Sequence, residues 1–231
     1  MAKEFNSTVF VSLLCLSFAF HTKAQTGNLP EKNFEMPKVG QKHTDMNPEQ
    51  LKQSIASFKL VMNSYPANFV TEAQRASTYE LWTNAYLSAQ SRVEGGNLSE
   101  EALFHQSEIL RLGHNMQIKD ADQVGMESVE KCLKLFPKSI QCHFASMNLY
   151  LSVNSSHASK AERSLRYLRN AFAPNINEEV ERAYVDYYLS TGQEKRAAKQ
   201  IDAFQKGFPK SRSKKVLEQV RRAIGQAPTA N

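Results

Sequence analysis

Cys132 and Cys142 carry the most reactive groups in the second half of this chain, because two nearby thiols can form a disulfide or ligate a metal. They lie five residues on either side of Pro137, near the end of one expected helix and the start of the next. In an antiparallel helix pair they would lie at similar height, which suits a disulfide. Cys132 also lies on an apolar face, so a small buried hydrophobic residue is an equal alternative.

Neither metal chemistry nor catalysis is predicted from the other side chains. His143 follows Cys142, but no second ligand pair has the spacing of a structural zinc site. The sequence has no Gly-rich phosphate loop, no HExxH or GxSxG motif and no paired-carboxylate signature. His105 and His114 fall on different faces of one expected helix. We predict no catalytic, cofactor-binding or metal-binding residues; an enzyme whose site is defined by geometry alone is the less favoured alternative.

Positive charge is concentrated near the C-terminus. From residue 159 onward there are 15 Lys and Arg residues against 8 Asp and Glu residues, whereas the whole chain has a formal net charge of +6. This surplus fits solvated helix faces, or a surface that docks an acidic protein, an anionic lipid or a polyanionic glycan. The second hypothesis assigns the basic surface to Arg163, Arg166, Lys214, Lys215, Arg221 and Arg222.

Residues 1–24 have the organisation of a secretory signal peptide. Lys3 precedes an apolar run over residues 9–20, and a small residue, Ala24, precedes the expected cleavage before Gln25. The run is short for a bilayer span, so an uncleaved anchor is the alternative. We expect the chain to be secreted to the bacterial periplasm, which is an oxidising compartment. For an exported protein we expect no nucleic-acid partner. Residues 25–46 are polar, contain Gly and Pro, and predict an extended or disordered leader.

An apolar pattern occurs three times in the second half of the chain, shifted by 36 residues each time. Each copy begins with a small residue and continues with mostly apolar residues at i+4, i+7 and i+11, and a proline follows closely. This spacing places the four residues on one face of an α-helix. The copies are Gly125, Val129, Cys132 and Phe136; Ala161, Leu165, Leu168 and Phe172; and Ala197, Ile201, Phe204 and Phe208.

Short polar or Pro- and Gly-containing connections divide the chain into helices and place neighbouring helices antiparallel. The sequence predicts helices over residues 122–136, 140–153, 158–172, 178–190, 194–207 and 212–223. Upstream, Asn47 and Pro48 start a helix that is expected to reach residue 64, a second covers 70–93, and a third starts at Ser99. No run of two-residue alternation predicts a sheet, and residues 225–231 are expected to fray.

The period and pattern resemble the tetratricopeptide repeat (TPR), a helix-turn-helix unit of about 34 residues. In the best copy, Ile109-x2-Leu112-Gly113-x2-Met116 is similar to the first helix of that motif, and the copy at Gly125 follows as its second helix. The copies are divergent, because the motif's tryptophan is absent from all three first helices, and Ser146-Met147 and Ala183-Tyr184 replace the Leu-Gly pair in the later two. The resemblance covers three repeats over residues 106–211, extends loosely over 47–105, and leaves 212–224 as a capping helix.

This resemblance implies an all-α, right-handed solenoid of antiparallel helix pairs, whose first helices line a concave face that binds other proteins. The implied function is an exported scaffold or adaptor, in the assembly of a cell-envelope complex, that binds a protein or peptide. The partner-binding residues predicted on this face are His143, Met147, Tyr150, Val180, Tyr184 and Tyr187. The alternative function is an electrostatic surface binder that uses the basic C-terminal repeats.

Overall fold

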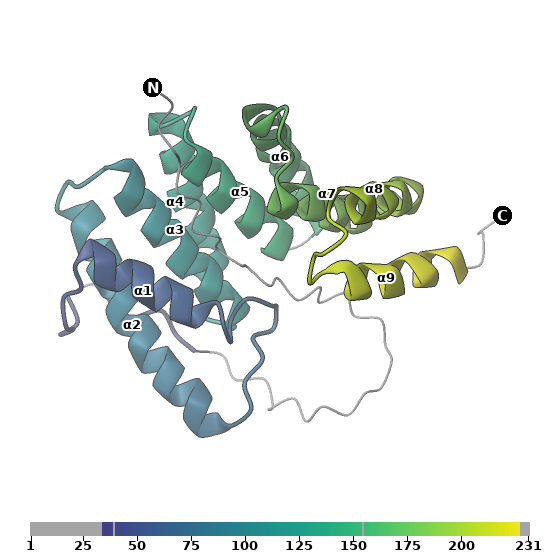
Figure 1. The fold of residues 1–231 in the computed structure, drawn as a ribbon. Coiled ribbons are helices and arrows are strands. Elements are labelled where there is room, and N and C mark those ends of the chain that lie inside the picture. Colours follow the sequence, from purple (N-terminus) through teal and green to yellow (C-terminus); the bar gives the residue numbers. More distant parts are fainter. Residues whose placement is uncertain (1–33, 39, 154, 227–231) are drawn as a thin grey trace.

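The computed structural model describes residues 34–226 except 39 and 154, and this part of the chain is all-α (Figure 1). Its helices are α1 (Pro48–Phe58), α2 (Glu72–Glu94), α3 (Glu100–Asn115), α4 (Ala121–Leu135), α5 (Ile140–Val153), the 3-10 helix η1 (Ser155–His157), α6 (Ala158–Phe172), α7 (Glu178–Ser190), α8 (Glu194–Gly207) and α9 (Lys214–Gln226). The expected signal peptide lies outside the described residues. None of the described helices is both long enough and apolar enough to cross a membrane.

Hydrogen-bonding caps fix where the helices begin. The Asn47 side chain accepts a hydrogen bond from the backbone N–H of Gln50, and the Gln50 side chain accepts one from the N–H of Asn47, each at 2.9 Å. The first helices of the three repeats, α3, α5 and α7, have equivalent caps. Their capping residues are Ser99, Ser139 and Asn177. Because each cap accepts from the N–H three residues later, the three helices share one register.

The repeated apolar face lies in the core, as its spacing predicts. Val129, Leu165 and Ile201 are fully buried at equivalent positions of α4, α6 and α8. At the small position, a Cβ added to Gly125 would lie 3.3 Å from the Cβ of Leu110 on α3, so α3 and α4 approach closely. Successive helices pack together, and α3 also packs on α5, and α5 on α7 (Figure 1).

Among the described glycines, Gly113 on α3 leaves the least space for a side chain, because it faces Trp82 on α2. The indole of Trp82 is fully buried, and its Nε1–H donates to the carbonyl of Ile109 at 2.7 Å. A Cβ on Gly113 would lie 2.4 Å from Cζ2 of Trp82. Glycine is therefore required here by the indole, and not by a turn or a positive φ angle.

The first helix is shorter than predicted: α1 ends at Phe58 and does not reach residue 64. The next segment instead packs against the C-terminal end of α3. Met62 is fully buried, and its carbonyl accepts from Nδ2 of Asn115 at 2.8 Å. The carbonyl of Asn115, which has no acceptor role within its own helix, accepts from the N–H of Ala67 at 2.7 Å. These tertiary hydrogen bonds compete with continuation of α1.

The described part of the expected leader is extended and packs along α2. The ring of Phe34 stacks on Tyr79 with centroids 4.2 Å apart, and the Tyr79 hydroxyl donates to the carbonyl of Glu35 at 2.8 Å. Further along, the N–H of Met46 donates to Oγ of Ser88 at 3.0 Å. Among the described residues the only β contact is a bridge between Phe34 and Ile118.

At the other end of the molecule, α9 covers α8. Leu217 and Val220 of α9 are buried in one cluster with Ile201 and Phe204 of α8. The helix that the sequence predicts as a cap thus packs its apolar side on the preceding helix. Residues 227–231, part of the expected tail, lie outside the described residues.

Candidate functional site

The six side chains predicted to bind a partner are buried in the structure and do not form an open surface. Their exposed fractions are 4% for His143, 0% for Met147, 1% for Tyr150, 1% for Val180, 4% for Tyr184 and 7% for Tyr187. They face the second helices instead: the hydroxyl of Tyr150 donates to Glu130 on α4, and that of Tyr187 donates to Glu162 on α6. Because one residue rotates a helix face by 100°, the open face begins one position away.

His143 illustrates this structural role. One ring nitrogen lies 3.1 Å from Oγ of Ser164, the other lies 3.1 Å from the carbonyl of Pro137, and the ring stacks on Tyr167 at 3.8 Å. Burial lowers the pKa of His143, although the Pro137 carbonyl acts in the opposite direction. The imidazole therefore joins α5 to α6 and is closed off from a partner.

An open groove of about 320 Å³ lies on the neighbouring face of the first helices, and we call it the α1–α7 groove. Side chains from four helices line it. They are Lys52, Ile55 and Ala56 of α1, with Lys59 directly after it; Glu101, Phe104, His105 and Glu108 of α3; Gln141, Phe144 and Asn148 of α5; and Glu179 of α7. The groove therefore joins the N-terminal helix to all three repeats.

The common register of the caps explains why these side chains converge. The second residue after each cap is polar and lies at the rim: Glu101, Gln141 and Glu179. The fifth residue is aromatic in α3 and α5, where Phe104 and Phe144 are half-buried. The ninth residue is polar and lines the groove in α3 and α5, where it is Glu108 and Asn148. Since positions 2, 5 and 9 lie on one helical face, polar and aromatic side chains form rows across the groove.

A buried ion cluster forms one wall of the groove. Glu108 is 1% exposed, and it accepts from Arg111 through two bonds of 3.2 Å and lies 2.8 Å from Nζ of Lys59. Burial alone raises the pKa of Glu108, but the charges and hydrogen bonds of Arg111 and Lys59 outweigh it and lower the pKa to about 2. The Glu108 carboxylate is thus ionised, and its negative charge is balanced by the neighbouring cations. The apolar floor beside it is therefore compatible with an uncharged ligand group.

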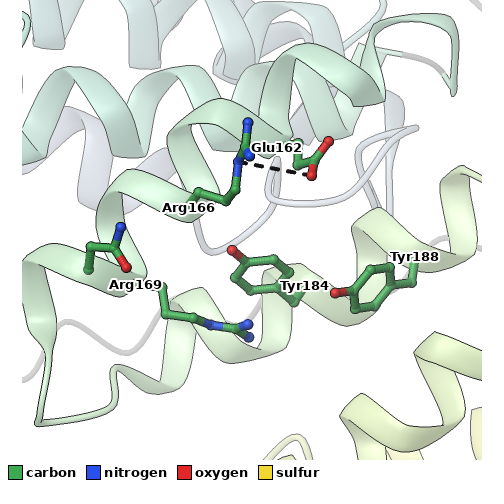
Figure 2. A pocket seen from close by; sticks show the side chains of 6 residues that line it. Glu162, Arg166, Arg169, Tyr184 and Tyr188 are labelled. Carbon is green, nitrogen blue, oxygen red and sulfur yellow. Dashed lines mark ion pairs between the residues drawn. The ribbon is translucent and has the colours of Figure 1, made fainter.

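A second, smaller pocket of about 290 Å³ lies between α6 and α7, and we call it the Arg–Tyr pocket (Figure 2). Its lining residues are Glu162, Arg166, Arg169, Asn170, Tyr184 and Tyr188. The guanidinium of Arg169 lies 3.5 Å from the centroid of the Tyr184 ring. Tyr184 therefore belongs to a site, although it is a different site from the predicted concave face.

The predicted basic surface is divided between separate helices. Arg163 and Arg166 lie on α6, whereas Lys214, Lys215, Arg221 and Arg222 lie on α9. Helix α9 packs on α8, and α6 packs on α5 and α7. Arg221 pairs with Asp202 of α8 at 3.2 Å, which neutralises one of the α9 cations.

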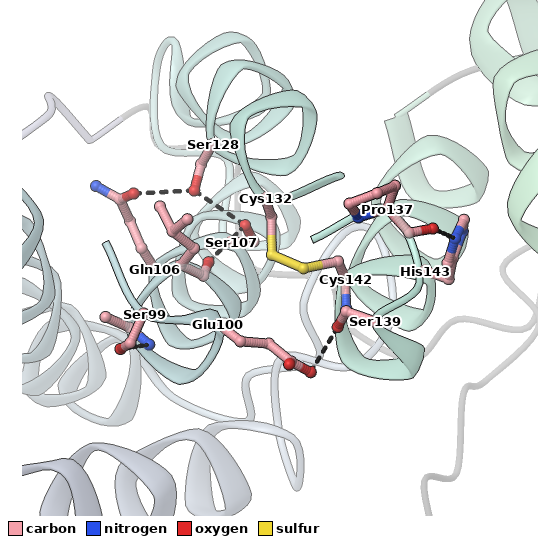
Figure 3. Close-up of a disulfide and its surroundings, with 12 residues drawn as sticks. Ser99, Glu100, Gln106, Ser107, Ser128, Cys132, Pro137, Ser139, Cys142 and His143 are labelled. Atoms are coloured by element: carbon pink, nitrogen blue, oxygen red, sulfur yellow. Dashed lines mark hydrogen bonds between the residues drawn. A yellow bond between two sulfur atoms is a disulfide. The ribbon is translucent and has the colours of Figure 1, made fainter. Parts of the chain in front are cut away.

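Cys132 and Cys142 form a disulfide with a Cα–Cα distance of 5.6 Å, and this bond ties α4 to α5 (Figure 3). Both residues are fully buried. Beside the bond, Oγ of Ser139 accepts from the N–H of Cys142 at 2.9 Å and donates to Glu100 at 2.6 Å. Of the two interpretations that the sequence left open, the structure contains the disulfide. It fixes the start of α5, one of the groove helices.

No family model matches the chain, and no curated protein or solved structure is similar to it. Within the described part of the chain, no three His, Cys, Asp or Glu side chains are grouped so that they could hold a metal ion. Function is therefore inferred from the geometry of the groove and the pocket.

The predicted partner-binding residues lie on two of the four groove helices, α5 and α7, and none of them lines the groove. Phe144 and Asn148 lie one position after the predicted His143 and Met147. A usable signal was present in the sequence. Phe104 and Phe144 each lie five residues after a serine cap, and the second residue after each of these caps is polar. Aligning the three helices by their caps, and not by the TPR pattern, would have identified this face.

Proposed function

We propose that this protein is an exported, non-catalytic adaptor that binds a segment of another protein in the α1–α7 groove. The observation that carries the proposal is the convergence of side chains from four helices on one groove, with an apolar floor and a polar rim. Ligand sites in proteins have this composition, and a volume of about 300 Å³ or more is typical of them. The groove suits a few residues of a partner.

The floor would hold an apolar anchor of the partner. Phe104 and Phe144 are half-buried, and Ile55 lies beside them on α1. Full burial of one Leu- or Phe-sized side chain contributes about 1.5–3 kcal/mol, which makes such an anchor the main source of affinity. Nδ2 of the buried Asn148 donates to Oε1 of Glu179 at 3.5 Å, and the partly exposed Glu179 has a second carboxylate oxygen to accept from the partner's backbone.

The proposed architecture is a right-handed solenoid of TPR-like helix pairs. It is supported by the pairing of α3 with α4, α5 with α6 and α7 with α8, and by the additional contacts of α3 with α5 and α5 with α7. One helix pair cannot cover its own apolar face, so each pair is stabilised by the next. A concave surface made by first helices follows from this arrangement, and we place the groove there.

Site-specific photo-crosslinking in the native cells tests the groove. A photoreactive residue replaces Glu101 at the groove rim, or Glu127, an exposed glutamate of α4 outside the groove, as the matched control. We expect a discrete protein adduct from position 101, and we expect Phe144→Ala to reduce its yield. Equal adducts from positions 101 and 127, or an adduct insensitive to Phe144→Ala, would remove the groove as the binding surface.

The electrostatic alternative has its own supporting observation. Exposed cations follow one another on the outer side of α8, where Lys195, Lys199 and Lys206 have no ion-pair partner among the described residues. Attraction between exposed charges is screened within about 8 Å at physiological salt. Partner capture that is lost at moderate salt therefore supports the basic surface, and capture that persists supports the groove.

The proposal of export to the bacterial periplasm rests on the N-terminal sequence. The expected cleavage predicts a mature chain that begins at Gln25. N-terminal sequencing of the protein from a periplasmic fraction tests this directly. Recovery of the intact N-terminus from the cytoplasm would contradict export.

A further inference from the structure

The Arg–Tyr pocket is built by residues that the groove does not use. Figure 2 shows the Tyr184 ring between Arg166 and Arg169, with Tyr188 beside it and Glu162 near Arg166. Arg169 is held rigidly, because its Nε and Nη2 donate to the two carboxylate oxygens of Glu181 at 2.8 and 2.6 Å. The tyrosine rings lie 5.9 Å apart and are tilted by 37°. This side of the pocket is therefore preorganised.

Arg166 differs from Arg169 in having a loose partner. Its Nε is 4.0 Å from Oε1 of Glu162, a distance beyond a hydrogen bond, and its side chain is 69% exposed. Glu162 is anchored elsewhere, since its Oε2 accepts from the Tyr187 hydroxyl at 2.9 Å. Arg166 is thus the cation of this pocket that is available to a carboxylate of a ligand.

The remaining groups restrict the ligand further. Glu162 keeps one carboxylate oxygen for accepting hydroxyl hydrogens, and Asn170 adds an amide that both donates and accepts. Because Arg169 is paired with Glu181, Glu162 repels a phosphate dianion more strongly than a singly charged carboxylate, and a cation would be repelled by Arg166. A volume of about 290 Å³ limits the ligand to a single ring-sized unit.

We propose that the Arg–Tyr pocket binds a sugar acid, with its carboxylate on the Arg166 guanidinium, its hydroxyls on Glu162 and Asn170, and its ring against Tyr188. A planar guanidinium matches a carboxylate in a bidentate pair, and tyrosine supplies an apolar ring face with a polar edge. This site is separate from the proposed groove, so the chain would bind a glycan end and a protein by different faces.

NMR titration of the full chain tests the pocket with four probes: galacturonate, galactose, acetate and inorganic phosphate. We expect galacturonate to bind at least about tenfold more tightly than the other three, since it alone combines a carboxylate for Arg166 with hydroxyls for Glu162 and Asn170 and a ring face for Tyr188. Arg166→Gln should weaken galacturonate binding by at least about tenfold, and Tyr188→Leu should weaken galacturonate but not acetate. Arg212→Gln, at an exposed position between α8 and α9, makes the same change of charge outside the pocket and should have no effect.

Several results would overturn the assignment. Phosphate binding as tight as galacturonate binding would indicate a general anion site. Galactose binding as tight as galacturonate binding would show that Arg166 does not bind the carboxylate. Equal effects of Arg166→Gln and Arg212→Gln would indicate attraction by overall charge. Lack of galacturonate binding to a folded chain would reject the site. None of these outcomes bears on the groove, whose crosslinks are measured separately.

Discussion

Substitution of Gly113 by alanine tests the helix packing on which the groove is built. Gly113 lies on α3, and the helix is held against α2 by the buried indole of Trp82. The new Cβ would lie 2.4 Å from Cζ2 and 2.8 Å from Cε2 of that indole. The indole cannot move freely, because Nε1 donates to Ile109 and the ring stacks on Tyr86 with centroids 5.3 Å apart.

The net effect is a difference between two terms of opposite sign. Overpacking of a core costs about 1–3 kcal/mol, and loss of the indole hydrogen bond adds about 1 kcal/mol. Replacement of glycine by alanine within a helix contributes about 1 kcal/mol of stability. We therefore expect Gly113→Ala to lower the free energy of unfolding by about 2 kcal/mol, although alanine is the better helix former.

Urea unfolding followed by far-UV circular dichroism measures this change, and two further variants isolate its cause. Gly225→Ala is the matched control on α9, where an added Cβ meets only Arg221 at 3.8 Å, so it should leave stability unchanged or raise it. In a Trp82→Leu background the clash is absent, and Gly113→Ala should become stabilising by up to about 1 kcal/mol.

The sign of the stability change that Gly113→Ala causes in the Trp82→Leu background decides whether the indole excludes a side chain at position 113. If Gly113→Ala destabilises the chain equally in both backgrounds, the indole is not what excludes a side chain at this position. If Gly113→Ala stabilises the otherwise unchanged protein, the close approach of α2 and α3 does not exist in solution. Either result would require a different arrangement of the N-terminal helices around the groove.

Two further predictions concern the buried ion cluster and the disulfide. The pKa of Glu108 is lowered from 4.5 to about 2, so its stabilising contribution is present above pH 4.5 and should be lost, by about 3 kcal/mol, as the pH falls through that range. Glu108→Gln should cost about 3 kcal/mol at neutral pH, and its difference from the unaltered protein should shrink in acid; urea unfolding curves that shift in parallel with pH would contradict this. Removal of the disulfide by Cys132→Ala with Cys142→Ala, which opens a loop of sequence separation 10, should lower the free energy of unfolding by about 2–3 kcal/mol, and unchanged urea midpoints would show that the bond does not form.

Most helices could be predicted because their signals are local. Residues 140–153 and 158–172 were predicted as helices and coincide with α5 and α6, since apolar spacing and flanking breaks mark them in the sequence. The end of α1 could not be predicted this way. It is decided by hydrogen bonds to Asn115, a residue far along the chain on α3.

The candidate site was predictable only to the level of its helices. Helix α5 carries apolar residues around most of its circumference, so periodicity does not distinguish Phe144, at the groove, from Met147, in the core. Which of the two is exposed depends on where α4 and α6 lie. The pairing of Cys132 with Cys142 was likewise undecided until the two helices were placed side by side.

The sequence by itself determined that this chain is helical, where most helices begin and end, and that one apolar face recurs every 36 residues. Only the tertiary structure decided which faces remain open, that Lys59, Glu108 and Arg111 meet in one cluster, and that Arg166 lacks a close partner. The physical reason is that periodicity reports a helix's own geometry, whereas exposure and charge pairing depend on neighbours that are distant in sequence.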